Sequence, residues 1–305
     1  MYECSSQGSS VLILEKTSYT RLGPRNDLAR ITDFRGPQGM NRNWITEGII
    51  LKTFPIGDQH RGVVLCTPEN GNISVIAHGA GSPRSKLRAI TLPLATGTFY
   101  LYEDPGRNSI KITDLELRKV PEGLRSDLNG FYAASLAAEV LLYGHGVSEN
   151  PEFYRLFSEV LDTLDDFVQN PPSDISTDEK VRSVTTIMIS FLWKYLEFSG
   201  IYPDTGICSR TEEPLAPRTA GWYNPREGGF ISAGAGGVTN GEEGLVRIPA
   251  PGITILDWFL DKPFARIQSE PLPPAPLGAL LHLGVFLVEQ SIDRKLKSAQ
   301  VFRSL

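Results

Sequence analysis

Three cations at alternating positions could bind phosphate groups. Arg84, Lys86 and Arg88 follow a glycine turn formed by Gly79 and Gly81. If this segment is extended, its side chains repeat every two residues, so all three cations would point to one side. Like charges on one face repel each other unless solvent or a polyanion compensates them. Two interpretations follow, a phosphate-binding edge and a solvated basic loop.

The balance of charge restricts the kind of partner. The chain has 305 residues, a net charge of -5 and a pI near 5.5, so basic surface can only be local. Residues 44–125 hold ten Lys and Arg against eight Asp and Glu, a balance of +2 that leaves -7 for the remainder. Any contact with nucleic acid should therefore be confined to a patch in this segment and depend strongly on salt.

The inventory of reactive side chains gives little support to catalysis or metal binding. Cys4, Cys66 and Cys208 form no CxxC pair, and the four histidines have no ligand spacing. This cysteine usage is typical of a reducing cytoplasm, where we expect the protein to work. No apolar run reaches the roughly 20 residues that cross a bilayer. The chain contains no GxSxG, HExxH or Walker motif, so we expect neither an enzyme nor a bound cofactor.

Short strand patterns between residues 44 and 125 predict a small barrel. Strands are expected at 46–54, 62–67, 73–78, 92–102 and 110–117, with a hairpin centred on Asn70 and Gly71. Five short antiparallel strands in about 80 residues suit a closed barrel of the oligonucleotide-binding (OB) type. In the fourth strand, Tyr100 and Tyr102 alternate with apolar residues and are expected to face outward.

The segments on either side of the barrel differ from it in character. Residues 1–43 are rich in Ser, Gly, Arg and Asn and are expected to be poorly ordered, with Met40 as a hypothetical start of translation. From residue 126 onward apolar residues recur with a helical period. Helices are expected at 126–143, 151–170, 177–198, 254–260 and 276–299, with a glycine-rich irregular insert at 200–244. The predicted fold class is α+β multidomain, a barrel at 44–125 followed by a helical bundle at 126–305.

An ordered set of short motifs resembles the bacterial recombination mediator family RecO. The matching segments are Glu47–Thr53, Gly71–Ala80 with the basic residues 84–87 after it, Leu124–Leu128, Asn224–Gly229 and Leu296–Ser298. Each motif is weak alone, but together they cover residues 45 to 300 in the order of the family. The resemblance implies an OB-fold barrel, a helical domain and a role in recombinational DNA repair. It further implies binding of single- and double-stranded DNA, annealing of complementary strands, and recombinase loading with RecR and single-strand-binding protein.

The resemblance also assigns candidate DNA-binding residues. It favours phosphate contact over a solvated loop for Arg84, Lys86 and Arg88. His78 stands where family members tend to have lysine, which weakens the patch near neutral pH because an imidazole of ordinary pKa is mostly neutral there. The complete candidate set is Lys52, Arg61, His78, Arg84, Lys86, Arg88, Tyr100 and Tyr102, the two tyrosines as stacking platforms for bases.

Many members of this family carry a four-cysteine zinc site in the insert, and this chain departs from that pattern. The corresponding positions are Cys208, Thr211, Ser232 and Ala235. Only Cys208 can supply a thiolate, so no tetrahedral zinc is expected.

A second hypothesis comes from the acidic balance of the chain. The net charge of -5 and the neutral His78 also suit an adaptor whose helical domain recruits repair partners while the barrel has little DNA affinity of its own. A salt-titrated binding assay with single-stranded DNA separates the two hypotheses.

Overall fold

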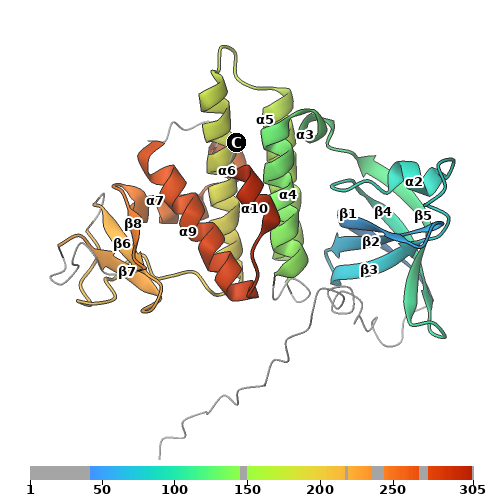
Figure 1. Cartoon of the computed structure of the whole chain (residues 1–305), viewed down its shortest axis with the longest axis horizontal. Coiled ribbons are helices and arrows are strands. Elements are labelled where there is room, and N and C mark those ends of the chain that lie inside the picture. The colour runs from blue at the N-terminus through green and yellow to red at the C-terminus, as the bar shows by residue number, and fades with distance from the viewer. Residues whose placement is uncertain (1–41, 145–149, 217–218, 235–243, 268–273, 304–305) are drawn as a thin grey trace, which may run out of the picture. The chain divides into compact units, whose positions relative to one another are not determined.

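The computed structural model describes residues 42–144, 150–216, 219–234, 244–267 and 274–303 (Figure 1). The predicted N-terminal extension, including Met40, lies outside these residues except for its last two positions. No helix in the described part of the chain is both long and apolar enough to span a membrane.

Five strands close into a barrel, as predicted. They are β1 (Asn43–Ile56), β2 (His60–Thr67), β3 (Gly71–Ala77), β4 (Thr96–Asp104) and β5 (Ser109–Lys119), in the order β1-β2-β3-β5-β4. All neighbours are antiparallel except β3 and β5. Side chains alternate across each strand, so Phe99 and Leu101 of β4 are buried while the tyrosines beside them face outward. The barrel therefore has a filled core, which leaves its outer surface and loops to contact any ligand.

Two barrel details differ from the prediction. Gly71 pairs with Thr67 and has φ +57°, so the β2–β3 loop consists of residues 68–70 instead of centring on Asn70 and Gly71. The fourth strand begins at Thr96 instead of residue 92. Residues 92–95 form a turn in which Leu94 has φ +68°, and the Leu94 N–H donates to the Ile50 carbonyl at 2.8 Å. That hydrogen bond ties the turn to β1 and prevents an early start of the strand.

The basic segment after the glycine turn is also different from the extended form considered above. Lys86–Ile90 is a short helix, α2, which follows a turn at residues 79–84. Helical residues two positions apart lie on different faces. Lys86 and Arg88 therefore do not form a single row of cations with Arg84.

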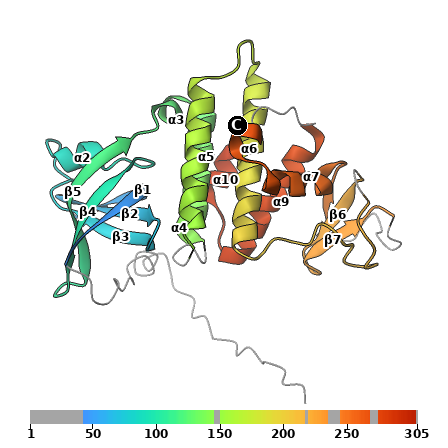
Figure 2. The ribbon, with the colours of Figure 1, turned by 180° about the vertical axis from the view of Figure 1, so that it is seen from behind.

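The three long helices after the barrel match the sequence prediction, and a short helix before them, α3 (Glu122–Ser126), was not predicted. α3, α4 (Leu128–Tyr143), α5 (Glu152–Gln169) and α6 (Thr177–Phe198) follow the barrel (Figures 1 and 2). Asp127 caps α4 by accepting a hydrogen bond from the Gly130 N–H at 2.8 Å. Ser176 and Glu179 form a reciprocal capping box at the start of α6. The apolar faces of α4, α5 and α6 pack on one another, which gives the expected bundle.

The end of the chain contains a break that the sequence pattern did not predict. α7 (Gly252–Asp261), α8 (Phe264–Ile267), α9 (Pro274–Ile292) and α10 (Lys297–Phe302) complete the helices. The expected helix at 276–299 is thus two helices. Asp293 has φ +49°, and buried Glu289 accepts hydrogen bonds from the Leu296 N–H and the Lys295 ammonium. This contact stabilises the turn between α9 and α10.

The glycine-rich insert is more regular than expected. Two strands of the insert, β6 (Gly221–Asn224) and β7 (Gly229–Ser232), form a three-stranded sheet with β8 (Val246–Ile248), which follows just after residue 244. The strand order is β7-β6-β8. Cys208 and Ile231 form a small core with Leu215 and Leu245 against them.

Polar contacts join the barrel to the helices. The Asn72 side-chain amide of β3 donates to the Leu141 carbonyl of α4 at 2.6 Å. The Lys119 ammonium at the end of β5 lies 2.7 Å from Asp162 and 3.2 Å from Asp165, both on α5. The described residues of the barrel and of the helical region accordingly belong to one compact unit.

Candidate nucleic-acid interface

The glycine turn is fixed by close packing against the β1–β2 loop. Gly79 has φ +73°, a conformation that side chains other than glycine rarely adopt. The Gly81 N–H donates to the Gln59 carbonyl at 2.9 Å, and a Cβ on Gly81 would collide with the Asp58 carbonyl oxygen. Both glycines therefore serve to hold the residues that follow against the barrel.

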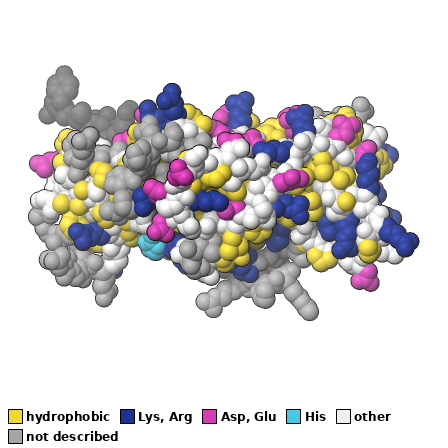
Figure 3. Space-filling model, turned by 90° about the horizontal axis from the view of Figure 1, so that it is seen from above, with side chains coloured by type: hydrophobic (Ala, Val, Ile, Leu, Met, Phe, Trp, Pro, Cys, Tyr) yellow, Lys and Arg dark blue, Asp and Glu magenta, His cyan; other side chains and the backbone are white. Residues whose placement is uncertain are grey.

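Arg84, Lys86 and Arg88, here called the basic turn, are exposed on the barrel surface. Figure 3 shows Lys and Arg side chains gathered over the barrel end on this face of the molecule. Lys86 is paired only loosely, at 3.6 Å from Asp114, with 77% of its side chain exposed. The Arg88 guanidinium donates to the Gly81 carbonyl at 2.8 Å and so also closes the turn. Because exposed ion pairs contribute little free energy, Lys86 can exchange Asp114 for a phosphate at small cost.

Arg61 of β2 forms hydrogen bonds with the end of the basic turn. Its Nη1 donates to the Thr91 carbonyl at 2.9 Å, to the Thr91 hydroxyl at 3.0 Å and to the Arg88 carbonyl at 3.3 Å. These acceptors lie at the C-terminal end of α2, where carbonyl groups are left without helical partners. Arg61 is thus a residue that positions α2, in addition to being a cation near it.

His78 lies next to a second histidine that the sequence pattern did not single out. The rings of His60 and His78 meet edge to face with centroids 4.6 Å apart, and His60 Nδ1 accepts a hydrogen bond from the Gly79 N–H at 3.1 Å. Burial lowers the pKa of His78 below its ordinary 6.5, and the charges of His60, Lys111 and Arg107 lower it further. His78 is therefore mostly neutral near pH 7. Its basic neighbours are Arg107, which is exposed, and Lys111, which pairs with Asp104 at 2.9 Å.

Protonation of His78 should couple DNA binding to pH. A bound phosphate stabilises the imidazolium, so affinity for single-stranded DNA should rise by about three- to tenfold as pH falls from 7.5 to 5.5. His78→Gln should remove most of this rise, whereas His282→Gln, on α9, should leave it intact. Anisotropy titrations at several pH values measure the effect. An identical pH profile for wild type and His78→Gln would contradict the coupling.

The same pKa shift has an opposite consequence for folding. The folded-state pKa of His78 lies below its ordinary value, so the unfolded chain binds the proton more readily. Stability therefore falls as pH drops through about 6.5 toward the folded value. Circular dichroism should accompany the titrations, so that binding is compared only where the protein is folded.

The two predicted stacking residues face outward but have other neighbours. The Tyr100 hydroxyl donates to Glu116 at 2.9 Å, and this hydrogen bond, with the charges of Glu116 and Asp114, raises the pKa of Tyr100. Tyr102 has the Lys111 ammonium 5.8 Å from its ring centroid. Lys111 also pairs with Asp104 at 2.9 Å, so Tyr102 lies beside an ion pair. Base stacking at either tyrosine remains a prediction.

Lys52 belongs to a different site from the basic turn. It lies on β1 opposite Val64 and lines a cavity with residues of α4 and the α9–α10 segment. The sequence pattern also did not single out Arg107 and Lys111, whose charges act on His78. Lys111 pairs in register with Ile76 across the parallel β3–β5 contact, which no local sequence pattern predicts.

Three of the four insert positions aligned above with zinc ligands, Cys208, Thr211 and Ser232, lie together without offering a zinc site. Burial raises the pKa of the Cys208 thiol, but hydrogen bonds from the Thr211 side chain and from the backbone of Ser232, Arg210 and Thr211 outweigh it and lower the pKa to about 7. Hydroxyl and backbone donors thus surround the sulfur where thiolates would be needed, so these residues do not fit tetrahedral zinc. Ala235 lies outside the described residues.

Comparison with known proteins agrees with this architecture. The family model "Recombination protein O N terminal" matches residues 40–120, and "Recombination protein O C terminal" matches residues 125–300. The chain is 28% identical to DNA repair protein RecO of Cyanothece sp. over 258 residues, which cover 83% of this chain and 77% of the relative.

Two further relatives carry the same name. DNA repair protein RecO of Bacillus subtilis is 30% identical over 162 residues, covering 53% of this chain and 58% of the relative. The protein of Acaryochloris marina is 30% identical over 200 residues, which cover 65% of this chain and 62% of the relative. The chain thus spans less than two thirds of these two relatives. Both family models together extend over the barrel and the helical region, and the chain therefore belongs to the RecO family of recombination proteins.

Proposed function

We propose that this protein is a DNA-binding mediator of recombinational DNA repair that makes and breaks no covalent bond. The barrel holds single-stranded DNA by its phosphates, and bound strands are brought together for annealing. The observation that carries the proposal is a closed five-stranded barrel with exposed cations on a glycine-anchored turn, in a chain that matches both RecO family models. Small barrels of this kind bind single strands through cationic grooves and loops.

The chemistry of the basic turn supports phosphate contact over base-specific recognition. Arginine and lysine bind phosphates of any sequence, whereas reading bases requires donors and acceptors aimed at base edges. The basic turn lies in an acidic protein with a net charge of -5. Binding should therefore be independent of sequence, local and sensitive to salt.

We further propose RecR and single-strand-binding protein as partners, in the loading of recombinase at the nucleoid. The helical region is the candidate for these contacts because it holds the acidic excess of the chain. Exposed Glu159, Asp162 and Asp166 on α5 contribute to this acidic character.

A salt titration of the full-length protein tests the function. A fluorescent single-stranded oligonucleotide is titrated between 50 and 200 mM salt, and annealing of complementary strands is followed in parallel. With the three cations of the basic turn and two further cations on phosphates, log K should fall against log salt with a slope of about -3.5, since each contact on a single strand contributes roughly 0.7.

Absence of salt-dependent binding in this assay would overturn the proposal. If purified RecR or single-strand-binding protein still formed a complex with the chain, the acidic helical region would then favour the adaptor function. Binding without any acceleration of annealing would contradict the annealing step alone.

A further inference from the structure

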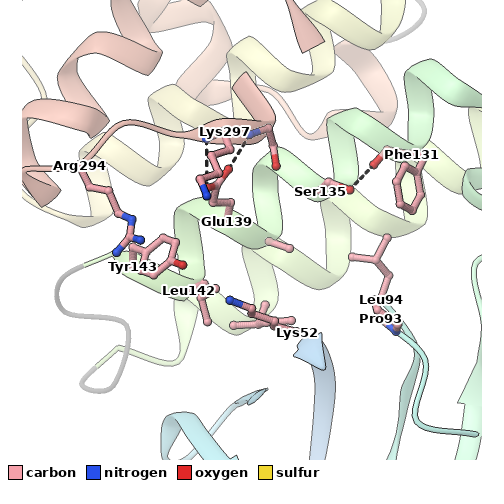
Figure 4. Close-up of a pocket in the computed structure, with 13 residues that line it drawn as sticks. Lys52, Pro93, Leu94, Phe131, Ser135, Glu139, Leu142, Tyr143, Arg294 and Lys297 are labelled. Carbon is pink, nitrogen blue, oxygen red and sulfur yellow. Dashed lines mark hydrogen bonds between the residues drawn. The ribbon is translucent and has the colours of Figure 1, made fainter. Parts of the chain in front are cut away.

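A cavity of about 310 Å³ lies where the barrel meets α4. Its walls come from β1, from the turn at residues 92–95, from α4, and from the segment that ends α9 and begins α10 (Figure 4). This volume is at the small end of ligand pockets, which measure roughly 300–1,000 Å³. A cavity of this size can hold one group of nucleotide size, but it is too small to hold a folded protein. We call it the α4 pocket.

The α4 pocket has an apolar end and a cationic end. Phe131 lies beside Pro93 and Leu94 at one end, and 39% of Phe131 is exposed. Lys52 and Lys297 line the other part of the pocket, together with Arg294, whose guanidinium lies 4.0 Å from the centroid of the Tyr143 ring. An occupant should therefore combine an apolar, flat group with negative charge.

The carboxylate that lines the α4 pocket, Glu139, already accepts hydrogen bonds from the backbone. Glu139 accepts hydrogen bonds from the Lys297 N–H at 3.1 Å and from the Ser298 N–H at 2.7 Å, and it thereby caps the start of α10. By contrast, neither Lys52 nor Lys297 forms a side-chain ion pair with another residue in the described ranges. The charge that remains to be compensated in the α4 pocket is positive.

The backbone around the α4 pocket does not offer a strand edge to a peptide. The turn at 92–95 is bonded to β1, with Leu94 N–H donating to the Ile50 carbonyl at 2.8 Å and Ile50 N–H to the Ala95 carbonyl at 3.0 Å. The middle turns of α4 bond their backbone groups within the helix. Side chains must therefore recognise the occupant. Proteins hold single-stranded nucleic acid by stacking bases on aromatic rings and by binding phosphates with cationic groups.

We propose that the α4 pocket receives one nucleotide of single-stranded DNA, with the base against Phe131 and the adjacent phosphates at Lys52 and Lys297. This inference rests on the proposed DNA-binding function and extends the DNA path from the barrel to the helical region. The linker from the basic turn supports such a path, because only Ala89 to Leu92 separate Arg88 from Pro93 in the wall of the pocket.

Substitutions in the full-length protein test the two ends of the α4 pocket separately. Lys52→Gln with Lys297→Gln should weaken binding of single-stranded DNA about tenfold at 50 mM salt and reduce the salt slope by about 1.4 for the two lost contacts. Phe131→Ala should weaken binding roughly tenfold and change the salt slope little, since base stacking is not ionic. Thermal unfolding of each variant establishes that it is folded.

Controls match each substitution in chemistry and exposure. Arg155→Gln removes an exposed cation from α5, and Phe198→Ala removes an aromatic ring that is 37% exposed at the end of α6. Both should bind like wild type. In a second measurement, an oligonucleotide containing the fluorescent base 2-aminopurine should lose fluorescence on binding to wild type and Phe198→Ala, and regain most of it with Phe131→Ala.

The possible outcomes separate this inference from the DNA-binding function itself. If pocket variants bind like wild type while Ala substitutions in the basic turn weaken binding, the DNA-binding function stands and the α4 pocket assignment is overturned. No binding by wild type would refute both. If the pocket variants keep DNA affinity but lose binding of an acidic, apolar peptide, the α4 pocket is a protein-docking site and the inference is wrong.

Discussion

Replacing Arg84, Lys86 and Arg88 together with Ala should lower the affinity for single-stranded DNA by about two orders of magnitude at 50 mM salt. The salt slope should shrink by about 2, because each single-strand phosphate contact contributes roughly 0.7. The structure distinguishes the three residues. Lys86→Ala removes an exposed charge alone, whereas Arg88→Ala also removes the hydrogen bond that closes the turn on the Gly81 carbonyl.

A matched variant separates local contact from net charge. Ala at Arg118, Arg125 and Arg155 removes the same three positive charges from exposed sites on β5, α3 and α5. Compared at 0.1 M salt, its affinity should fall only a fewfold, since charges farther from the DNA than the screening length of about 10 Å contribute little. Equal losses in both variants would show that general electrostatics, and not the basic turn, determines binding.

Removing the buried carboxylate at the junction of barrel and helices should cause the largest loss of stability. Asp165 is 2% exposed, accepts a hydrogen bond from the Leu124 N–H at 3.3 Å and lies 3.2 Å from the Lys119 ammonium. Asp165→Ala leaves that N–H without its partner and opens a small cavity, so unfolding free energy should decrease by about 2–3 kcal/mol. Denaturant unfolding monitored by circular dichroism measures the change.

Asp162 provides the control for Asp165. It contacts the same ammonium at 2.7 Å, but 61% of its side chain is exposed. Asp162→Ala should cost less than about 1 kcal/mol because surface ion pairs contribute little. If both substitutions destabilise the protein equally, burial of Asp165 does not explain its contribution.

The pH dependence of this junction follows from Lys119. Burial alone lowers the pKa of Lys119, but the hydrogen bonds and charges of Asp162 and Asp165 outweigh burial and raise the pKa above 10.5. A raised folded-state pKa means that the ion pair stabilises the fold below pH 10.5 and ceases to do so as pH rises through the folded value. On the alkaline side of neutrality, wild type should therefore keep its stability advantage over Asp165→Ala until the solution is strongly alkaline, where Lys119 loses its proton.

The strand and helix patterns were sufficient to predict the barrel and the first helices because those signals are local. Alternating apolar residues define β1 to β5, and the Asp127 cap and Ser176 capping box mark where α4 and α6 begin. The break at Asp293 was missed because a buried carboxylate, Glu289, holds a turn within an otherwise continuous apolar pattern. The sheet in the insert was missed because three short strands with many glycines give little periodic signal.

The candidate site likewise contains residues that the sequence predicts and neighbours that only the structure reveals. Charge and spacing in the sequence singled out Arg84, Lys86 and Arg88 as candidates, and the family resemblance favoured phosphate contact there, whereas their exposure is a property of the fold. Register was needed to bring His60 to His78, because a hairpin centred on Asn70 and Gly71 would have placed another residue opposite His78.

The sequence by itself determined a small basic barrel followed by helices, the family, and the loss of three zinc-ligand residues in the insert, because residue types and local periods carry that information. The tertiary structure alone decided the role of each cation. Arg61 bonds to the end of α2, Lys52 joins Lys297 in the α4 pocket, and Lys86 is left exposed. The physical reason is that a cation's role depends on which carbonyl, carboxylate or ligand lies within reach, and long-range pairing sets those neighbours.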